Sequence, residues 1–294
     1  MRSETAYYGL IDALASGFRA LRDPACTRWL GPVVPGATMA FGARVPGTSY
    51  VLDPVQAAFN LGVMGGWPDG RGDEAWSSSG ARPADTLAGV LIVADFLARE
   101  AIAAARPPLT LQDVLTRLAQ ARAIQQRLAS ATADIGAGGD CTRPVRVATA
   151  AVVAAMIGGT HDQVSQAAAY AWIEGDEPAA RVTAADASVR AGWVRAEAAS
   201  RGVRLAWLAL AAAPGAAVAW PSEVAPVLEV ISGHHDEEPP LSAAIAAQVR
   251  ERFEATVTQH FPMAQAGRIK ALYGAPDALA ATPFNECISV LVRN

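Results

Sequence analysis

The residues with the clearest chemical potential lie together between positions 190 and 201. Arg190, Trp193, Arg195, Glu197 and Arg201 occur here, directly before an apolar run with helical spacing. Guanidinium groups bind carboxylates well, and the first turn of a helix favours anions. The stretch therefore predicts a helix start at which Arg190 and Arg201 hold a polar or anionic substrate and Glu197 acts as a base. Trp193 would line that pocket, although ordinary core packing explains a tryptophan here equally well.

A second group of candidates lies in the polar, glycine-rich segment 65–83, which interrupts the helical periodicity. It carries Asp69, Asp73 and Arg82, and Asp85 follows at the start of the next expected helix. A loop this long between two good helices is often functional, although a plain solvated loop has the same composition. We expect Asp69, Arg82 and Asp85 to contact the substrate and Asp73 to serve as a base.

Cys141 is the third catalytic candidate, as a nucleophile or base, but no histidine is near it in sequence. The three cysteines form no CxxC pair and the four histidines form no HExxH motif, so no metal site and no disulfide framework are expected. The adjacent His234 and His235 lie in a charged, proline-rich stretch where histidines are usually solvated. Free cysteines make a reducing cytoplasm the expected location.

The composition favours packed helices. Hydrophobic residues make up 52% of the 294 residues, alanine supplies much of that share, and aromatic residues reach only 6%. The net charge of −4 gives no basic surface for nucleic acid. No run of about 18 apolar residues occurs, so no membrane contact is expected. We predict an all-α protein.

Helical periodicity predicts about ten helices and no strand, with the Gly- and Pro-rich crossing at 31–50 left as an ordered loop. The main expected helices are Tyr7–Leu21, Asp53–Met64, Ala84–Ala105, Leu111–Ser130, Pro144–Ile157, His161–Ile173, 190–210, 222–231, Leu241–Gln259, Met263–Leu272 and Ala281–Asn294. Residues 178–189 are expected to be a loop or a frayed helix.

Several local sequence signals predict where these helices begin. Asp53 precedes Pro54, Thr110 precedes an apolar run, and Thr160 with Gln163 forms a capping box. Thr282 is expected to cap the last helix, before Pro283 in its first turn.

Over nearly its whole length the chain resembles the MmgE/PrpD family, most closely its cofactor-independent 2-methylcitrate dehydratases. The resemblance lies in the amino-acid sequences of specific segments: LGPVVPGATMAFGARVPGTSYVLDPVQAAFNLGVM at 30–64, PPLTLQDVL at 107–115, RVATAAVVAAMIGGT at 146–160, the stretch 190–210, RFEATVTQHFP at 252–262 and ATPFNECISVLV at 281–292. It implies a multi-helix domain, no cofactor, and a homodimer formed through the helical domain.

The family also carries a smaller α+β domain, and its active site lies between the two domains. Here the chain passes from the expected helix ending at 231 almost directly to its C-terminal helices. The resemblance therefore implies a helical domain at 1–231, a linker at 232–240 in place of the small domain, and helices at 241–294 that pack back on the helical domain.

Other departures affect proton transfer. The family's His-Pro-Ser-Asp-Asn run is similar to Arg82–Thr86, so arginine replaces the histidine. Its Arg-Lys-Ser-Trp motif is similar to Arg190–Trp193, where Ala191 replaces the lysine, and its Asp-His pair resembles Asp140–Cys141. Arginine is a poor proton carrier, so we expect the ancestral dehydration to be lost.

Two functions remain open. In the first, the chain is a diverged lyase that carries out an elimination, isomerisation or cyclisation on a small substrate. In the second, it is a catalytically inactive scaffold with a structural or partner-binding role. A closed, water-excluding pocket at the candidate residues favours the first, and a filled or flat surface favours the second.

Overall fold

The computed structural model describes residues 4–68, 82–132, 142–174, 184–212, 225–233 and 240–293. Within these ranges it contains thirteen helices and one small hairpin. The helices are α1 (Glu4–Ala20), α2 (Pro24–Thr27), α3 (Pro54–Gly66), α4 (Pro83–Ala103), α5 (Leu111–Thr132), α6 (Thr142–Met156), α7 (His161–Ile173), α8 (Ala184–Ala211), α9 (Ala225–Ile231), α10 (Ala243–His260), α11 (Met263–Tyr273), α12 (Pro276–Ala280) and α13 (Phe284–Ser289). The prediction of an essentially all-α fold is confirmed.

Within the described ranges, a small hairpin departs from that fold class. β1 (Ala43–Arg44) pairs antiparallel with β2 (Val51–Leu52) inside the crossing that was expected to have no strand. The turn between them includes Gly47 at a φ of 81°, a conformation that favours glycine. Two residues per strand are too few for an alternating pattern, so the sequence carried no strand signal.

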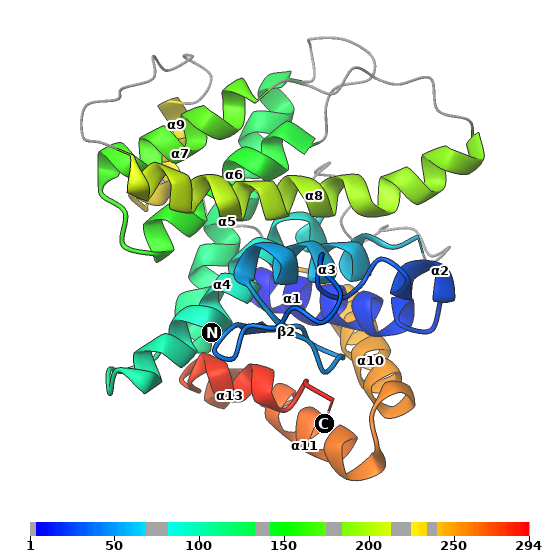
Figure 1. Ribbon diagram of the computed structural model, residues 1–294. Helices are drawn as coiled ribbons and strands as arrows, with labels where there is room; N and C mark the ends of the chain where they lie inside the picture. Colours follow the sequence, from blue (N-terminus) through cyan, green and yellow to red (C-terminus); the bar gives the residue numbers. More distant parts are fainter. Residues whose placement is uncertain are drawn as a thin grey trace.

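α8 is the long helix that crosses the upper half of the molecule, with α3 beneath it and α6 and α7 on its other side (Figure 1). Small residues allow the close approach. A Cβ on Gly62 of α3 would lie 2.8 Å from the Cα of Ala196, and one on Gly202 would lie 2.7 Å from the carbonyl oxygen of Arg146 in α6. Side chains at these glycines would separate the three helices.

Two helix starts predicted from local chemistry, those of α3 and α7, are confirmed. Asp53 accepts hydrogen bonds from the backbone nitrogens of Val55 and Gln56, at 3.0 and 3.1 Å, with Pro54 first in α3. Thr160 and Gln163 form the predicted capping box of α7. Each of these signals acts within four residues, so sequence alone reveals it.

The predicted helix start at residue 190 is wrong. α8 begins at Ala184, so Arg190 and Trp193 lie inside the helix, beyond the first turn where a helix dipole attracts anions. Alanine is frequent at 184–191, and its high helix propensity extends α8 through part of the stretch expected to be a loop or frayed.

Short helices near the chain ends also differ from the prediction. α2 and α12 were not expected, and Pro283 rather than Thr282 occupies the N-cap of α13. The backbone of Thr282 instead pairs with the segment before α5: its carbonyl accepts from Leu111 at 3.0 Å, while the Phe284 nitrogen donates to the Leu109 carbonyl at 2.8 Å. This long-range pairing replaces the local cap.

The C-terminal helices contact the N-terminal helix through specific polar groups. Arg250 of α10 donates to the hydroxyl of Tyr8 in α1 at 2.8 Å, and Arg252 pairs with Asp12 at 3.1 Å. Eleven residues, 232–242, separate α9 from α10. The division into a helical domain, a linker and returning helices stays a prediction. Among the described helices, none is both long and apolar enough to cross a membrane.

One buried ion pair connects the hairpin, α4 and α13. Asp95 is fully buried and accepts from the backbone nitrogen and Nε of Arg44 at 2.9 and 3.1 Å through Oδ2, and from Nη2 at 2.5 Å through Oδ1. The same Nη2 donates to the Asn285 carbonyl at 2.8 Å. One guanidinium thereby holds three elements together.

We predict that Asp95→Asn lowers the free energy of unfolding by about 3–5 kcal/mol, because it leaves the largely buried Arg44 guanidinium, 16% exposed, without its counter-charge. Urea denaturation followed by circular dichroism measures this. Asp162→Asn, on an exposed side chain in the first turn of α7, is the matched control, with a change of at most about 1 kcal/mol. Equal effects of the two substitutions would contradict the assignment.

The His260 ring makes a second, pH-sensitive contact between the chain ends. It stacks on Phe18 of α1 with ring centroids 5.4 Å apart, and Nε2 lies 3.1 Å from the Gly47 carbonyl. Burial lowers the pKa of His260 below its ordinary 6.5, with further lowering by Arg293 and Arg22, although the Gly47 bond opposes this.

The folded chain binds a proton at His260 less readily than the unfolded chain does. The neutral ring therefore makes its full contribution to the free energy of unfolding above pH 6.5, and that contribution is lost as the pH falls below it. We predict a lower free energy of unfolding at about pH 5.5 than at about pH 7.5, with His260→Phe losing part of that difference. Urea melts at both pH values test this. The same difference in the variant and the parent would assign the effect to other groups.

Candidate functional site

Asp85 lies in the first turn of α4, where a carboxylate is favoured by the exposed backbone N–H groups. Arg82 occupies the N-cap and Pro83 begins the helix, and the Asp85 nitrogen donates to the Arg82 carbonyl at 3.1 Å. The side chain is nevertheless only 5% exposed. The predicted substrate-contacting carboxylate is therefore an interior group.

Three helices converge on this carboxyl group. Oδ2 of Asp85 accepts from Nε2 of Gln125 in α5 at 3.2 Å, and Oδ1 lies 3.8 Å from Nη1 of Arg195 in α8. Within the described part of the chain, Asp85 Oδ1 and Gln125 Oε1 are both buried and accept no hydrogen bond. Two acceptor oxygens with unused capacity thus lie in one cluster beside a cation.

The electrostatics of the cluster favour the protonated acid. Burial raises the pKa of Asp85, while Arg195, Arg82 and the hydrogen bond from Gln125 lower it, and the outcome is an increase. A buried carboxyl that keeps its proton closer to neutral pH is able to act as a general acid. The nearby guanidiniums supply positive charge for an anionic ligand.

Arg195 and Gln125 were not among the predicted site residues. Arg195 lies in the arginine-rich stretch but outside Arg190–Trp193, the run that resembles the family's Arg-Lys-Ser-Trp motif. A glutamine in a helix has no distinctive pattern, so nothing in the sequence pointed to Gln125. Its role depends entirely on how α5 packs beside α4.

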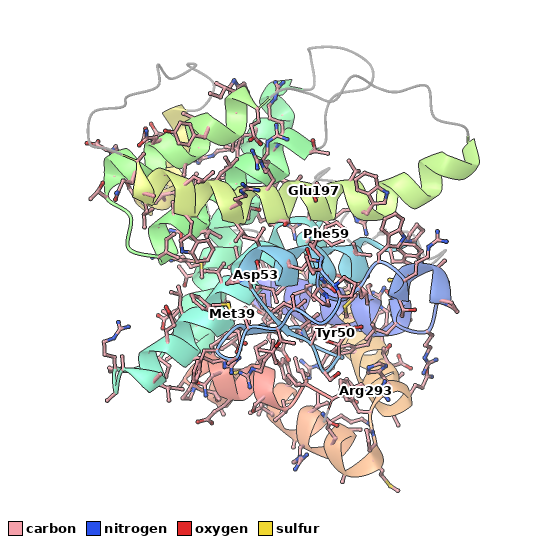
Figure 2. All side chains as sticks on the ribbon, viewed as in Figure 1. Met39, Tyr50, Asp53, Phe59, Glu197 and Arg293 are labelled. Carbon is pink, nitrogen blue, oxygen red and sulfur yellow. The ribbon has the colours of Figure 1, made fainter. Side chains whose placement is uncertain are left out.

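Glu197 is exposed, which differs from the partly buried position that a tuned base needs. Figure 2 shows it on α8 above Phe59 of α3. Arg201 contacts Glu174 at the end of α7, with Nε 2.8 Å from each carboxylate oxygen. That bond lowers the pKa of Glu174 and raises that of Arg201. Arg201 therefore binds Glu174 rather than Asp85, and the roles predicted for Glu197 and Arg201 stay predictions.

Trp193 makes packing contacts. Its ring stacks on Trp29 with centroids 6.1 Å apart and an interplanar angle of 28°, and it packs with Phe59 against a small cluster that includes Val63 and Trp67. These contacts fit the core-packing interpretation of Trp193. They also connect α8 to the segment after α2.

The remaining predicted residues carry less structural information. Asp69, Asp73 and Cys141 lie outside the described residues, and of Arg190 only the backbone within α8 is described.

Cys26 and Cys287 are buried, and burial raises the pKa of each thiol to about 12, so both stay protonated. The described residues contain no group of His, Cys, Asp and Glu that could hold a metal ion.

A pocket adjoins the same turns of α4, on the side that faces α1 and α5. It has an empty volume of about 300 Å³, including space continuous with solvent. Its lining is mainly apolar, with Arg122 as the charged member: Ala6, Gly9, Leu10, Pro83, Thr86, Leu87, Leu118, Ala119 and Arg122. Asp85 is not part of this lining, so the pocket neighbours the buried cluster without including it.

Residues 3–238 match the model of the MmgE/PrpD N-terminal domain. The chain belongs to the MmgE/PrpD family. A 2-methylcitrate dehydratase of Salmonella typhimurium is 43% identical over 207 residues, which cover 70% of this chain and 42% of that protein. Another from Cupriavidus necator is 44% identical over the same shares, and a fungal alkylcitrate dehydratase is 31% identical over 217 residues, 72% of this chain and 43% of that protein.

The resemblance stated from the sequence is therefore confirmed. The chain spans about two fifths of the length of the curated relatives it matches. The chain shares its family with enzymes named as dehydratases.

Proposed function

We propose that this chain is a lyase that eliminates water, without a cofactor, from a small hydroxylated carboxylic acid. The observation that carries the proposal is the buried Asp85, held between Gln125 and Arg195 in the fold of a family whose similar members are named dehydratases. Arg82 and Ala191 stand where the resemblance implies a histidine and a lysine. We therefore propose a substrate other than 2-methylcitrate.

The reaction needs an acid and a base. A base takes a proton from carbon, those bonding electrons form the carbon–carbon double bond, and the carbon–oxygen bond breaks toward oxygen. Asp85 in its protonated form supplies the proton that turns the departing hydroxyl into water. Arg195 and Arg82 hold the substrate carboxylate, because arginine keeps its charge and does not compete for the proton.

Asp73 is our proposed base, with Cys141 as the alternative, both on sequence grounds alone. Glu197 is less suitable because its side chain is exposed to solvent, outside any water-excluding site. The proposed division therefore places the acid on α4 and the base in the segment that precedes this helix.

The alternative is an inactive scaffold that binds a partner, and one observation favours it. Large apolar side chains are exposed along the segment that follows α2, at Trp29, Val33, Val34, Met39 and Phe41. The segment 29–43 contains no charged residue. Exposed apolar surface of this kind marks interaction sites, and an uncharged patch can face its own copy without repulsion. We propose this segment as the contact of a homodimer.

We predict that purified protein releases water from at least one of citrate and malate but not from 2-methylcitrate, and that Asp85→Asn reduces the rate about 10²–10⁴-fold, because it removes the transferable proton. Mass spectrometry of the unsaturated product measures both. Asp53→Asn is the matched control, since asparagine also caps α3 and Asp53 is exposed. Asp85→Asn with full activity would exclude Asp85 as the acid, and no product from any substrate would favour the scaffold.

We predict that the protein is a dimer and that Val33→Asp combined with Phe41→Asp makes it monomeric, because the paired copies would place like charges in an apolar contact. Size-exclusion chromatography with light scattering measures the mass. Met263→Asp, at a side chain 90% exposed on α11, is the control and leaves the mass unchanged. A monomeric parent protein would remove the dimer proposal.

A further inference from the structure

We propose that Asp85 Oδ1 and Gln125 Oε1 together recognise a substrate hydroxyl group, so that the chain selects hydroxycarboxylates over the same acids without the hydroxyl. This inference rests on the proposed function and adds to it the group that decides substrate choice. It assigns Gln125 as a specificity residue.

The starting observation is a pair of buried oxygens with unused capacity. Asp85 and Gln125 are 5% and 3% exposed, and their Oδ1 and Oε1 atoms accept no hydrogen bond from the described chain. Buried polar groups are nearly always bonded, because leaving one without a partner costs as much as a lost hydrogen bond. Two such atoms on side chains that touch each other indicate a shared ligand group.

A second buried glutamine on the same helix shows what a purely structural role looks like. Gln120 of α5 is 5% exposed, and both ends of its amide have partners. Its Nε2 lies 3.4 and 3.3 Å from the carbonyls of Val230 and Ile231, and its Oε1 accepts from Arg117 at 2.9 Å. Gln125 uses its nitrogen on Asp85 and leaves its oxygen available.

The chemistry of the pair selects a hydroxyl group. The Gln125 oxygen only accepts, while Asp85 donates when protonated, a form that burial favours. A hydroxyl accepts from the acid and donates to the amide oxygen, so one group satisfies both atoms. A carboxylate has no proton for Gln125, and an ammonium group would meet the positive charges of Arg195 and Arg82.

The test compares binding of paired ligands by isothermal titration calorimetry. Malate is paired with succinate, and citrate with tricarballylate, the same acid without its hydroxyl. We expect the parent protein to bind at least one hydroxy acid about 10–100 times more tightly than its partner, because the analogue leaves both oxygens unsatisfied. Gln125→Met, of nearly equal length, should bring that ratio close to one.

Gln120→Met is the matched control, and it keeps the ratio of the parent protein. Circular dichroism checks folding, and Gln125→Asn, which withdraws the amide by one methylene, replaces Gln125→Met if that variant does not fold. A parent protein that binds none of the four acids, or binds each pair equally, overturns the inference. So does an unchanged ratio in the Gln125 variant. Hydroxyl-selective binding without water release would instead support this site and refute the lyase proposal.

Discussion

The close approach of α8 to α3 sets the rotation of α8, and the candidate site depends on that rotation. Ala196 lies against Gly62, where no larger side chain fits. Successive helical residues point about 100° apart, so once Ala196 faces α3 the directions of its neighbours follow. Arg195 is directed to Asp85 at the start of α4, while Glu197 is directed to solvent. A contact between two small residues therefore decides which charged residue reaches the interior.

Two buried aspartates on α4 show how differently one helix can use a carboxylate. Asp95 is bonded at both oxygens by a single guanidinium, and that arrangement connects the hairpin, α4 and the C-terminal helices. Among the described residues, the Asp85 carboxyl accepts from the Gln125 amide and has a guanidinium at 3.8 Å, and burial outweighs the charges around it. The first aspartate has no capacity left for a ligand. Within the described part of the chain, the Oδ1 of Asp85 accepts no hydrogen bond, and its pKa is raised, as is common at functional sites.

Sequence patterns predicted the parts of this fold that are set locally. The caps at Asp53 and at Thr160 each involve residues within four positions, and their helices begin as expected. The predicted start of α8 was wrong because the helix propensity of alanine extends the helix toward its N-terminus. The predicted cap at Thr282 was wrong because the backbone of residues 282–284 pairs with Leu109 and Leu111 instead. Asp85 was found from its place in the first turn of an expected apolar helix. Gln125 could not be found, because its partner lies 40 residues away in another helix.

The substitutions within the family motif gain a physical meaning from this geometry. Arginine at position 82 and alanine at position 191 remove two side chains that could exchange protons near neutral pH. A proton must then come from a group whose pKa the interior raises, and in the described part of the chain the carboxyl of Asp85 has that property. Arg82 itself pulls the pKa of Asp85 down, so its charge limits how firmly the acid keeps its proton. Arg82, which stands where the family has a histidine, would thus adjust the pKa of Asp85, the acid that we propose instead.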